Sequence, residues 1–303
     1  MNKKNSLSAV ISVFNGEKEL NDCLKSISFA DEIIVVNNSS TDRTLDIAKQ
    51  YTNKIFTKPN NPMLNINKNF GFSKTKGKWI LYLDVDERVS EELREEIIHT
   101  IRNDSVMGYF LPRKNIIFGK WMEHTGWYPD YQLRLFQKGF GKFEEKHVHE
   151  MVSVTGKVGY LKGNLIHYNY STISQFLQKL QLYASNEAEN LIEEGYKFTW
   201  HDAISFPVKE FLSRFFARGG YKDGFHGLML SIFMAFYHFV VFACLWEKMG
   251  FERIDKNLIV GTAIEFKKSY KEFSFWINNE KLKTIENPFK KVAYKILRKI
   301  RGA

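Results

Sequence analysis

Strand-like and helix-like segments alternate from residue 7 to about residue 112, and this alternation restricts the possible fold more than any other feature of the chain. The apolar strand-like runs read LSAVISVF, EIIVVN, KIFTK and WILYLDVDE, and the helical segments between them read EKELNDCLKSI, TDRTLDIAKQY and LNINKNFGFSKT. A β-α-β-α-β-α-β order predicts an α/β fold with a mostly parallel, Rossmann-like sheet and right-handed crossovers. No GxGxxG follows the first strand, which argues against a standard dinucleotide-binding fold.

Residues 107 to about 170 carry shorter strand patterns, in MGYFLPRKNIIF, YQLRLFQ and NLIHYNY, separated by Gly-rich and aromatic turns. We expect these strands to continue the same domain, residues 1–170, as a mixed sheet whose loops shape a site.

Two carboxylates, Asp84 and Asp86, follow the apolar run Trp79 to Leu83. That run has little alternation and predicts a strand buried on both faces. Open α/β sheets bind ligands where such strands end, and two oxygen donors at i and i+2 suit a hard divalent cation. The alternative is a polar strand-to-helix turn, in which Ser90 caps the helix EELREEII.

Charge and cysteine content narrow the class of protein. The formal net charge is +10, and six basic residues with no acidic one lie between residues 287 and 303. A basic patch this local argues against a groove for nucleic acid and predicts no nucleic-acid partner. Only Cys23 and Cys244 are present, and the N-terminus lacks the apolar region of a secretory signal, so a reducing cytosol is expected.

Residues 171–286 predict a helical region. Thr172 and Gln175 have the spacing of a capping box for the helix ISQFLQKLQLYASNEAENLIEEG. A second helix, HDAISFPVKEFLSRFFARGG, is expected to be interrupted at Pro207. The most apolar helix, residues 227–246, has His238 as its strongly polar member. Its length and basic flanks favour an in-plane or partly inserted membrane helix; a buried helix or dimer interface and a true span are the alternatives.

The tail, residues 287–303, predicts an amphipathic helix with one apolar stripe and one basic face. This composition is typical of a helix on an anionic membrane surface, and a solvated basic helix end is the alternative.

Three segments of the first domain, in order, resemble motifs of one family. AVISVFNGEKEL is similar to V-x-x-Y-N-x-E-x-x-L, NNSSTDRT to D-D-G-S-T-D-x-T, and LDVDE to D-x-D, all of family 2 glycosyltransferases. These are inverting sugar-nucleotide enzymes of GT-A fold. The later segments HTGWYPDYQLRLF and KHVHE resemble the branch that adds glucose to lipopolysaccharide core.

On the donor side, the resemblance implies that Asn15 and Glu17 face the nucleotide. Asn38 stands where the family often has a carboxylate on the uracil, and an amide can also pair with a base edge. Asp42 matches a family Asp. Helix entry for Asn15 and Glu17, and capping for Asp42, are the alternatives.

For the metal, the resemblance implies Asp86 as principal ligand of Mg²⁺ or Mn²⁺, with Asp84 near the ribose and metal. His149 is a candidate for a further metal or diphosphate contact. Glu87 could assist, although it also suits the first turn of a helix.

On the acceptor side, Asp130 in WYPDYQLRLF matches the family's general base. Trp127 could stack on a sugar face, and Arg134 could bind phosphate or orient Asp130.

Taken together, these segments predict a divalent-metal-dependent inverting glycosyltransferase that moves a hexose, such as glucose from a UDP-sugar, to a lipid-linked saccharide like lipopolysaccharide core. Its GT-A domain and membrane-associating helical region place it on the cytoplasmic face of the inner membrane, peripheral or monotopic. A polyprenyl-phosphate glycosyltransferase is one alternative, and a membrane scaffold that binds sugar nucleotides without turnover is another. Replacement of Asp130 separates an enzyme from the scaffold, because an enzyme would lose turnover and keep donor binding.

Overall fold

The computed structural model describes residues 6–146, 150–253 and 257–300, with side chains up to residue 294. The chain divides into two compact units: residues 1–121 with 127–169, and residues 122–126 with 170–303. Residues 122–126, which the sequence placed with the first domain, therefore group with the helical unit.

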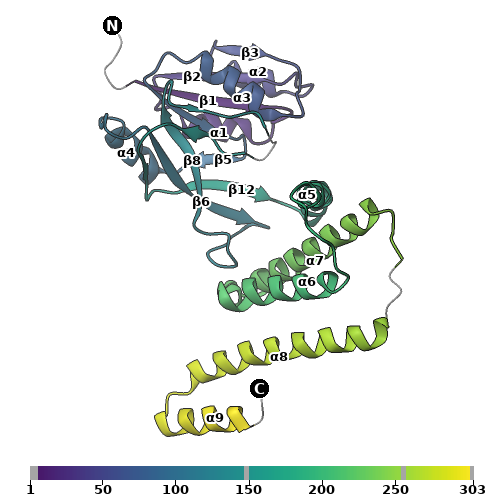
Figure 1. Ribbon diagram of the computed structural model, residues 1–303. Helices are drawn as coiled ribbons and strands as arrows, with labels where there is room; N and C mark the ends of the chain where they lie inside the picture. The colour runs from purple at the N-terminus through teal and green to yellow at the C-terminus, as the bar shows by residue number, and fades with distance from the viewer. Residues whose placement is uncertain (1–5, 147–149, 254–256, 301–303) are drawn as a thin grey trace. The chain divides into compact units, whose positions relative to one another are not determined.

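The first unit is built around four parallel strands in the order β3-β2-β1-β4 (Figure 1). These are β1 (Leu7–Val13), β2 (Glu32–Asn37), β3 (Ile55–Thr57) and β4 (Trp79–Leu83). The crossover helices between them are α1 (Leu20–Ser26), α2 (Thr44–Ala48) and α3 (Leu64–Ser73). The predicted α/β alternation is confirmed. Because β1 lies between β2 and β4, the chain reverses its direction of growth beside β1, which is where open α/β sheets bind ligands.

Antiparallel strands continue the same sheet beyond β4, in the order β8-β6-β12-β5, so the expected mixed sheet is confirmed. Their bounds are β8 (Asp130–Gln137), β6 (Gly108–Ile117), β12 (Leu165–Tyr170) and β5 (Glu87–Val89). The short strands β7 (Lys120–Trp121) and β11 (Val158–Tyr160) pair with β6, and β9 (Gly141–Lys142) pairs with β10 (Ser153–Val154). Helix α4 (Glu91–Thr100) begins as predicted, with the Ser90 hydroxyl accepting from Leu93 N at 3.2 Å.

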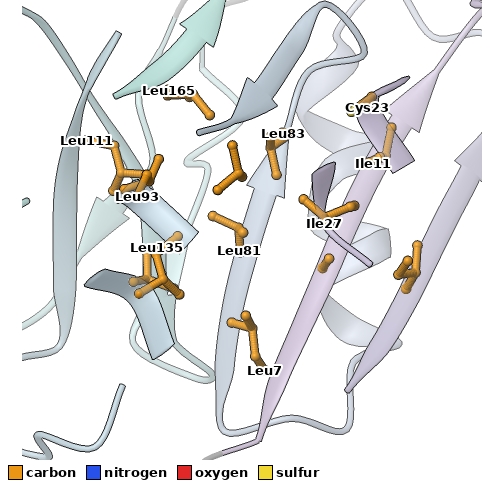
Figure 2. Packing of buried hydrophobic residues seen from close by; sticks show 14 of the residues in the cluster. Leu7, Ile11, Cys23, Ile27, Leu81, Leu83, Leu93, Leu111, Leu135 and Leu165 are labelled. Carbon is orange, nitrogen blue, oxygen red and sulfur yellow. The ribbon is translucent and has the colours of Figure 1, made fainter. Parts of the chain in front are cut away.

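Apolar side chains cover both faces of the central strands. On one face, Leu81 and Leu83 of β4 and Ile11 of β1 pack with Cys23 and Ile27 (Figure 2). On the other face, a second cluster contains Val10, Ile34, Phe72, Ile80, Tyr82 and Phe136. Every residue of β4 is buried, which explains why its sequence does not alternate. Burial raises the pKa of the Cys23 thiol, so this cysteine behaves as a small apolar core residue.

The second unit consists of helices. They are α5 (Ile173–Glu193), α6 (Asp202–Leu212), a π-helical turn (Ser213–Ala217), a 3₁₀ turn (Gly220–Asp223), α7 (Phe225–Lys248), α8 (Leu258–Thr284) and α9 (Pro288–Ile300). The predicted capping box is present, since Thr172 Oγ1 accepts from Gln175 N at 3.1 Å. Asp223, itself buried, accepts from His124 N at 2.9 Å, which joins residues 122–126 to this unit.

The predicted interruption at Pro207 is wrong, because α6 runs through this residue to Leu212. Pro207 has no N–H to donate to the carbonyl of Ala203, which lies in the first turn of the helix, so little of the hydrogen-bond ladder is lost. The geometry changes instead at Ser213, where the π-helical turn begins.

Helix α7 is exposed along much of its length. Ala184 and Ala188 of α5 pack against Val241, Phe242 and Leu245 of α7. By length and composition alone α7 could cross a membrane, and 28% of its most apolar stretch is buried within the structure. This fraction is low for the core helix of a soluble bundle.

Candidate active site

The turn after β1 is tied to the loop after β2. Asn15 has a left-handed backbone, with φ 49°, and its Oδ1 accepts from Thr41 N at 2.9 Å. Gly16 N donates to Thr44 Oγ1 at 2.8 Å, and a Cβ on Gly16 would lie 2.5 Å from a methyl group of Val13. The first two motifs, although some twenty-five residues apart, therefore form one rigid edge of the sheet.

Glu17 and Asp42 satisfy backbone donors in this edge. Asp42 Oδ2 accepts from Glu17 N at 3.0 Å, its Oδ1 accepts from Thr44 N at 3.0 Å, and Glu17 Oε2 accepts from Arg43 N at 3.2 Å. Burial by itself would raise the pKa of Asp42, but the hydrogen bonds from Thr44 and Glu17 outweigh it and lower that pKa. The capping role considered for Asp42 is only partly met, because Arg43 is the N-cap of α2 and makes no side-chain cap hydrogen bond, while Asp42 accepts from the first helical N–H, that of Thr44.

Asn38 lies beneath this edge, with 1% of its surface exposed. Its Nδ2 donates to Ser12 Oγ at 3.1 Å, and its Oδ1 accepts from Asn67 Nδ2 at 2.9 Å. Both ends of the amide are therefore engaged within the protein, and with 1% of Asn38 exposed a nucleobase could reach it only if its surroundings move.

Asp84 lies directly after β4 and carries two ion pairs. Lys68 Nζ of α3 is 2.6 Å from Asp84 Oδ1, and Arg134 Nη2 of β8 is 2.6 Å from Asp84 Oδ2. Arg134 Nη2 is also 2.8 Å from Oε1 of Glu87, and Glu87 Oε2 accepts from Asp84 N at 3.0 Å. Glu87 is fully buried in β5, and it is not the first-turn helix residue that its position in the sequence suggested.

The positive charges of Lys68 and Arg134 keep Asp84 ionised. Burial by itself would raise the pKa of Asp84, but the charges of Arg134 and Lys68 outweigh burial and hold that pKa well below its usual range. Burial would lower the pKa of Arg134, but Asp84 and Glu87 outweigh it and keep the guanidinium charged. Arg134 also lies over the Tyr82 ring, 4.5 Å from its centroid.

Asp86 lies beside a histidine that the sequence prediction missed. His167 Nε2 of β12 is 3.5 Å from Asp86 Oδ2. Asn115 Nδ2 donates to the Trp127 carbonyl at 2.8 Å, so Asn115 Oδ1 is the atom that faces His167 Nδ1, at 2.6 Å. Because that oxygen can only accept, Nδ1 carries the proton, and the lone pair of a neutral imidazole is on Nε2, toward Asp86.

Asp130 begins β8 and is held from three directions. Arg113 donates to Asp130 Oδ2 through Nε at 2.8 Å and Nη2 at 2.5 Å, Asn115 Nδ2 lies 3.3 Å from the same oxygen, and Gln132 donates to Oδ1 at 2.8 Å. Burial by itself would raise the pKa of Asp130, but the charge of Arg113 and these hydrogen bonds outweigh it and lower that pKa. The carboxylate is ionised at neutral pH, and 26% of its side chain is exposed.

The expectation that Arg134 orients Asp130 is not met, because Arg134 pairs with Asp84 and Glu87, and Arg113 contacts Asp130 instead. Arg113 and Asp130 are cross-strand partners on β6 and β8. The sequence carried one signal for this, since Arg113 and Asn115 are alternate polar residues on a single strand face. Trp127 is half-buried, and its carbonyl is the acceptor for Asn115.

The donor set fits a divalent cation in part. The carboxylate oxygen of Asp86 suits Mn²⁺ or Mg²⁺, and the imidazole nitrogen of His167 suits Mn²⁺ better than the harder Mg²⁺, whereas both oxygens of Asp84 are already ion-paired. Within residues 6–146, 150–253 and 257–300, no group of three or more His, Cys, Asp or Glu side chains is placed to hold a metal. His149, predicted as a further ligand, lies outside the described residues.

The comparisons of this sequence with known proteins agree on one family. The sequence model of Glycosyl transferase family 2 matches residues 8–155. The chain is 30% identical to an uncharacterized glycosyltransferase of Rickettsia typhi over 80% of this chain and 87% of that protein. It is 25% identical to the lipopolysaccharide core biosynthesis glycosyltransferase LpsC of Rhizobium meliloti over 80% of this chain and 92% of LpsC. Among solved structures, S. aureus TarS 1–349 in complex with UDP is 14% identical, with a TM-score of 0.40, over 83% of this chain and 93% of that one.

Proposed function

Because the chain belongs to glycosyltransferase family 2, we propose that it transfers a hexose from a UDP-sugar, such as UDP-glucose, to a lipid-linked saccharide with inversion at the anomeric carbon. The family membership supports a sugar-nucleotide donor. The likeness to LpsC over most of both chains supports an acceptor of the lipopolysaccharide-core type.

The observation that carries this proposal is a polar network joining Asp130 to both aspartates of the D-x-D motif. One route runs from Asp130 through Arg113, which is 3.5 Å from Glu87, and then through Arg134 to Asp84. The other runs from Asp130 through Asn115 and His167 to Asp86. A base and a diphosphate-binding group held in one rigid network suit a displacement that needs the acceptor and donor at fixed positions.

In this proposal Asp130 accepts the proton of the acceptor hydroxyl as its oxygen attacks the anomeric carbon from the side opposite the leaving UDP. Arg113 keeps Asp130 ionised and oriented. Asp86 and His167, with His149 as a further candidate, would hold the divalent cation, and Asp84 would lie near the ribose. A bound Mg²⁺ or Mn²⁺ neutralises charge on the diphosphate leaving group.

We also propose that the enzyme works at the cytoplasmic face of the inner membrane. Helix α9 is basic and amphipathic, and α7 exposes apolar side chains such as Phe236 and Phe239. A polyprenyl phosphate is the alternative acceptor class, and a membrane scaffold that binds sugar nucleotides without turnover is the alternative outside enzymes.

The test is Asp130→Asn in the full-length protein, assayed for sugar transfer and for sugar-nucleotide binding by calorimetry with Mn²⁺. We expect turnover to fall by about 10²–10⁴-fold with donor affinity unchanged, because the amide cannot accept the proton. Asp104→Asn is the control, since Asp104 pairs with Lys78 on the surface and 53% of its side chain is exposed. Full turnover in Asp130→Asn would refute the assignment of the base. Donor binding without transfer to any saccharide acceptor in the wild-type protein would favour the scaffold.

A further inference from the structure

The helical unit contains an apolar cavity that the proposed transfer reaction does not use. The cavity has a volume of about 430 Å³ and lies between α6, α7 and α8. Its lining includes Val208 and Phe211 of α6, Ile232 and Ala235 of α7, and Phe266 and Phe273 of α8. A volume in this range is that of a small-molecule site, and the side chains that line it are apolar apart from Ser269 and Tyr270, so they offer mainly dispersion and hydrophobic contact.

The apolar surface extends well beyond the cavity. Among its lining residues, Ile232 is 44% exposed and Phe266 is 59% exposed. Phe236 and Phe239, further along α7, are 46% and 48% exposed. A single small ligand in the cavity would leave these side chains in water, whereas a hydrocarbon phase would cover them together.

A polar cavity of about 310 Å³ adjoins the apolar one, since Ser269 lines both. In it, Glu265 is neutralised by Lys268 at 2.7 Å and faces His201 at 3.3 Å. Lys209 also lines this cavity, and its side chain is exposed. Among the described residues, no carboxylate lies within ion-pairing distance of Lys209, and its ammonium is 5.8 Å from the centroid of the Phe206 ring. Although Glu272 also lines this cavity, Lys209 provides a cation in it, and the preceding residue of α6, Val208, lines the apolar cavity.

We infer that the α6–α7–α8 cavity binds one hydrocarbon chain of a membrane phospholipid, with the lipid phosphate at Lys209. The adjoining apolar and charged spaces match the two parts of an amphiphile. The exposed surface of α7 favours a lipid that lies in a bilayer over a soluble amphiphile, because a bilayer would also cover Phe236 and Phe239. This inference rests on the proposed membrane association and is independent of the transfer chemistry.

The probe is a series of monomeric alkyl phosphates of increasing chain length, titrated by calorimetry into the full-length protein purified without detergent. Each added methylene should tighten binding about fourfold until the cavity is filled, since burial of one methylene is worth about 0.8 kcal/mol. Alkyl alcohols of equal length should bind up to about fivefold more weakly, because they lack the charge that Lys209 attracts. Lys209→Met should remove this difference, and inorganic phosphate alone should not bind.

The cavity itself is tested with Ala235→Phe, which fills the space from α7. The matched control is Ala243→Phe, a residue exposed on the same helix that does not line the cavity. We expect at least a tenfold loss of alkyl-phosphate affinity in the first variant and none in the second, with unchanged circular dichroism in both. Equal affinity in both variants, or affinity independent of chain length in the wild type, would overturn the inference.

The source of the lipid is tested by native mass spectrometry after incubation with vesicles of phosphatidylglycerol and phosphatidylethanolamine. A phospholipid retained by the wild type and by Ala243→Phe, and absent from Ala235→Phe, is the expected result; no retained phospholipid would refute a bilayer source. Deletion of residues 288–303 followed by vesicle co-sedimentation tests membrane association separately. The transfer assay with Asp130→Asn tests the proposed reaction. Failure of the lipid-binding inference, of membrane association and of the proposed reaction can therefore be distinguished.

Discussion

Arg113 should set the acid limb of the pH–activity profile. Its guanidinium makes two contacts with Asp130 Oδ2, at 2.8 and 2.5 Å, and its charge opposes the effect of burial on that carboxyl. Arg113→Met removes the positive charge and leaves the apolar stem roughly in place. If Asp130 is the base, the variant must show a higher pKa for the group that has to be deprotonated for activity.

The size of this effect follows from the geometry. Two unit charges about 4 Å apart interact by about 4 kcal/mol at an effective dielectric constant of about 20. Asp130 keeps 26% of its side chain exposed, so solvent weakens this interaction, and Arg113→Met raises the pKa of Asp130 by less than the full interaction energy would. The sign is fixed, because Arg113 lowers the pKa of Asp130 and its removal can only raise it. The acid limb therefore moves to higher pH.

The measurement is kcat/KM against pH for the wild type, Arg113→Met and Arg113→Lys. The lysine variant keeps the charge without the paired contacts, so its acid limb should move less than that of the methionine variant. Arg94→Met is the control, because Arg94 pairs with Glu91 on the surface. If the acid limb of Arg113→Met coincides with that of the wild type, either Asp130 is not the titrating base or Arg113 does not control it.

Three further outcomes are expected. Arg134→Met should lower the free energy of unfolding by about 3–5 kcal/mol in denaturant titrations, because it leaves the fully buried Glu87 charge without its closest cation. Adding Glu87→Gln should recover part of that loss, and simple additivity would contradict the pairing. Glu32→Gln should cost about 3 kcal/mol near neutral pH. Burial by itself would raise the pKa of Glu32, but Lys54, Ser8 and backbone donors lower it from 4.5 to about 2. The contribution of Glu32 to the free energy of unfolding is therefore present above pH 4.5 and lost as the pH falls toward 2. An acid-unfolding curve of the variant that matches the wild type would refute this. His167→Ala should weaken Mn²⁺ binding in the presence of UDP by at least about tenfold in calorimetry, and unchanged affinity would exclude His167 as a ligand.

Much of the fold could be predicted because it follows from local pattern. The apolar run of β4 has no alternation since both of its faces are covered, and the period of the helices between the strands is visible in their apolar spacing. The caps at Ser90 and Thr172 were predictable for the same reason, since a cap depends on residues three positions apart. The continuity of α6 through Pro207 was not, because it depends on where the helix begins, and a start at Asp202 leaves Pro207 close enough to the N-terminus to cost little of the hydrogen-bond ladder.

The sequence by itself determined the α/β order, the positions of Asp84, Asp86 and Asp130 at strand ends, and the family. Only the tertiary structure decided their partners. Lys68, Arg113, Arg134 and His167 come from α3, β6, β8 and β12. The sequence singled out Arg134, but it paired Arg134 with Asp130, whereas the structure pairs it with Asp84 and Glu87. The physical reason is that ion pairs form across strands and between a helix and a sheet edge, so strand order and register choose them. A carboxylate can be placed from its own strand, but its charge state depends on residues that folding brings beside it.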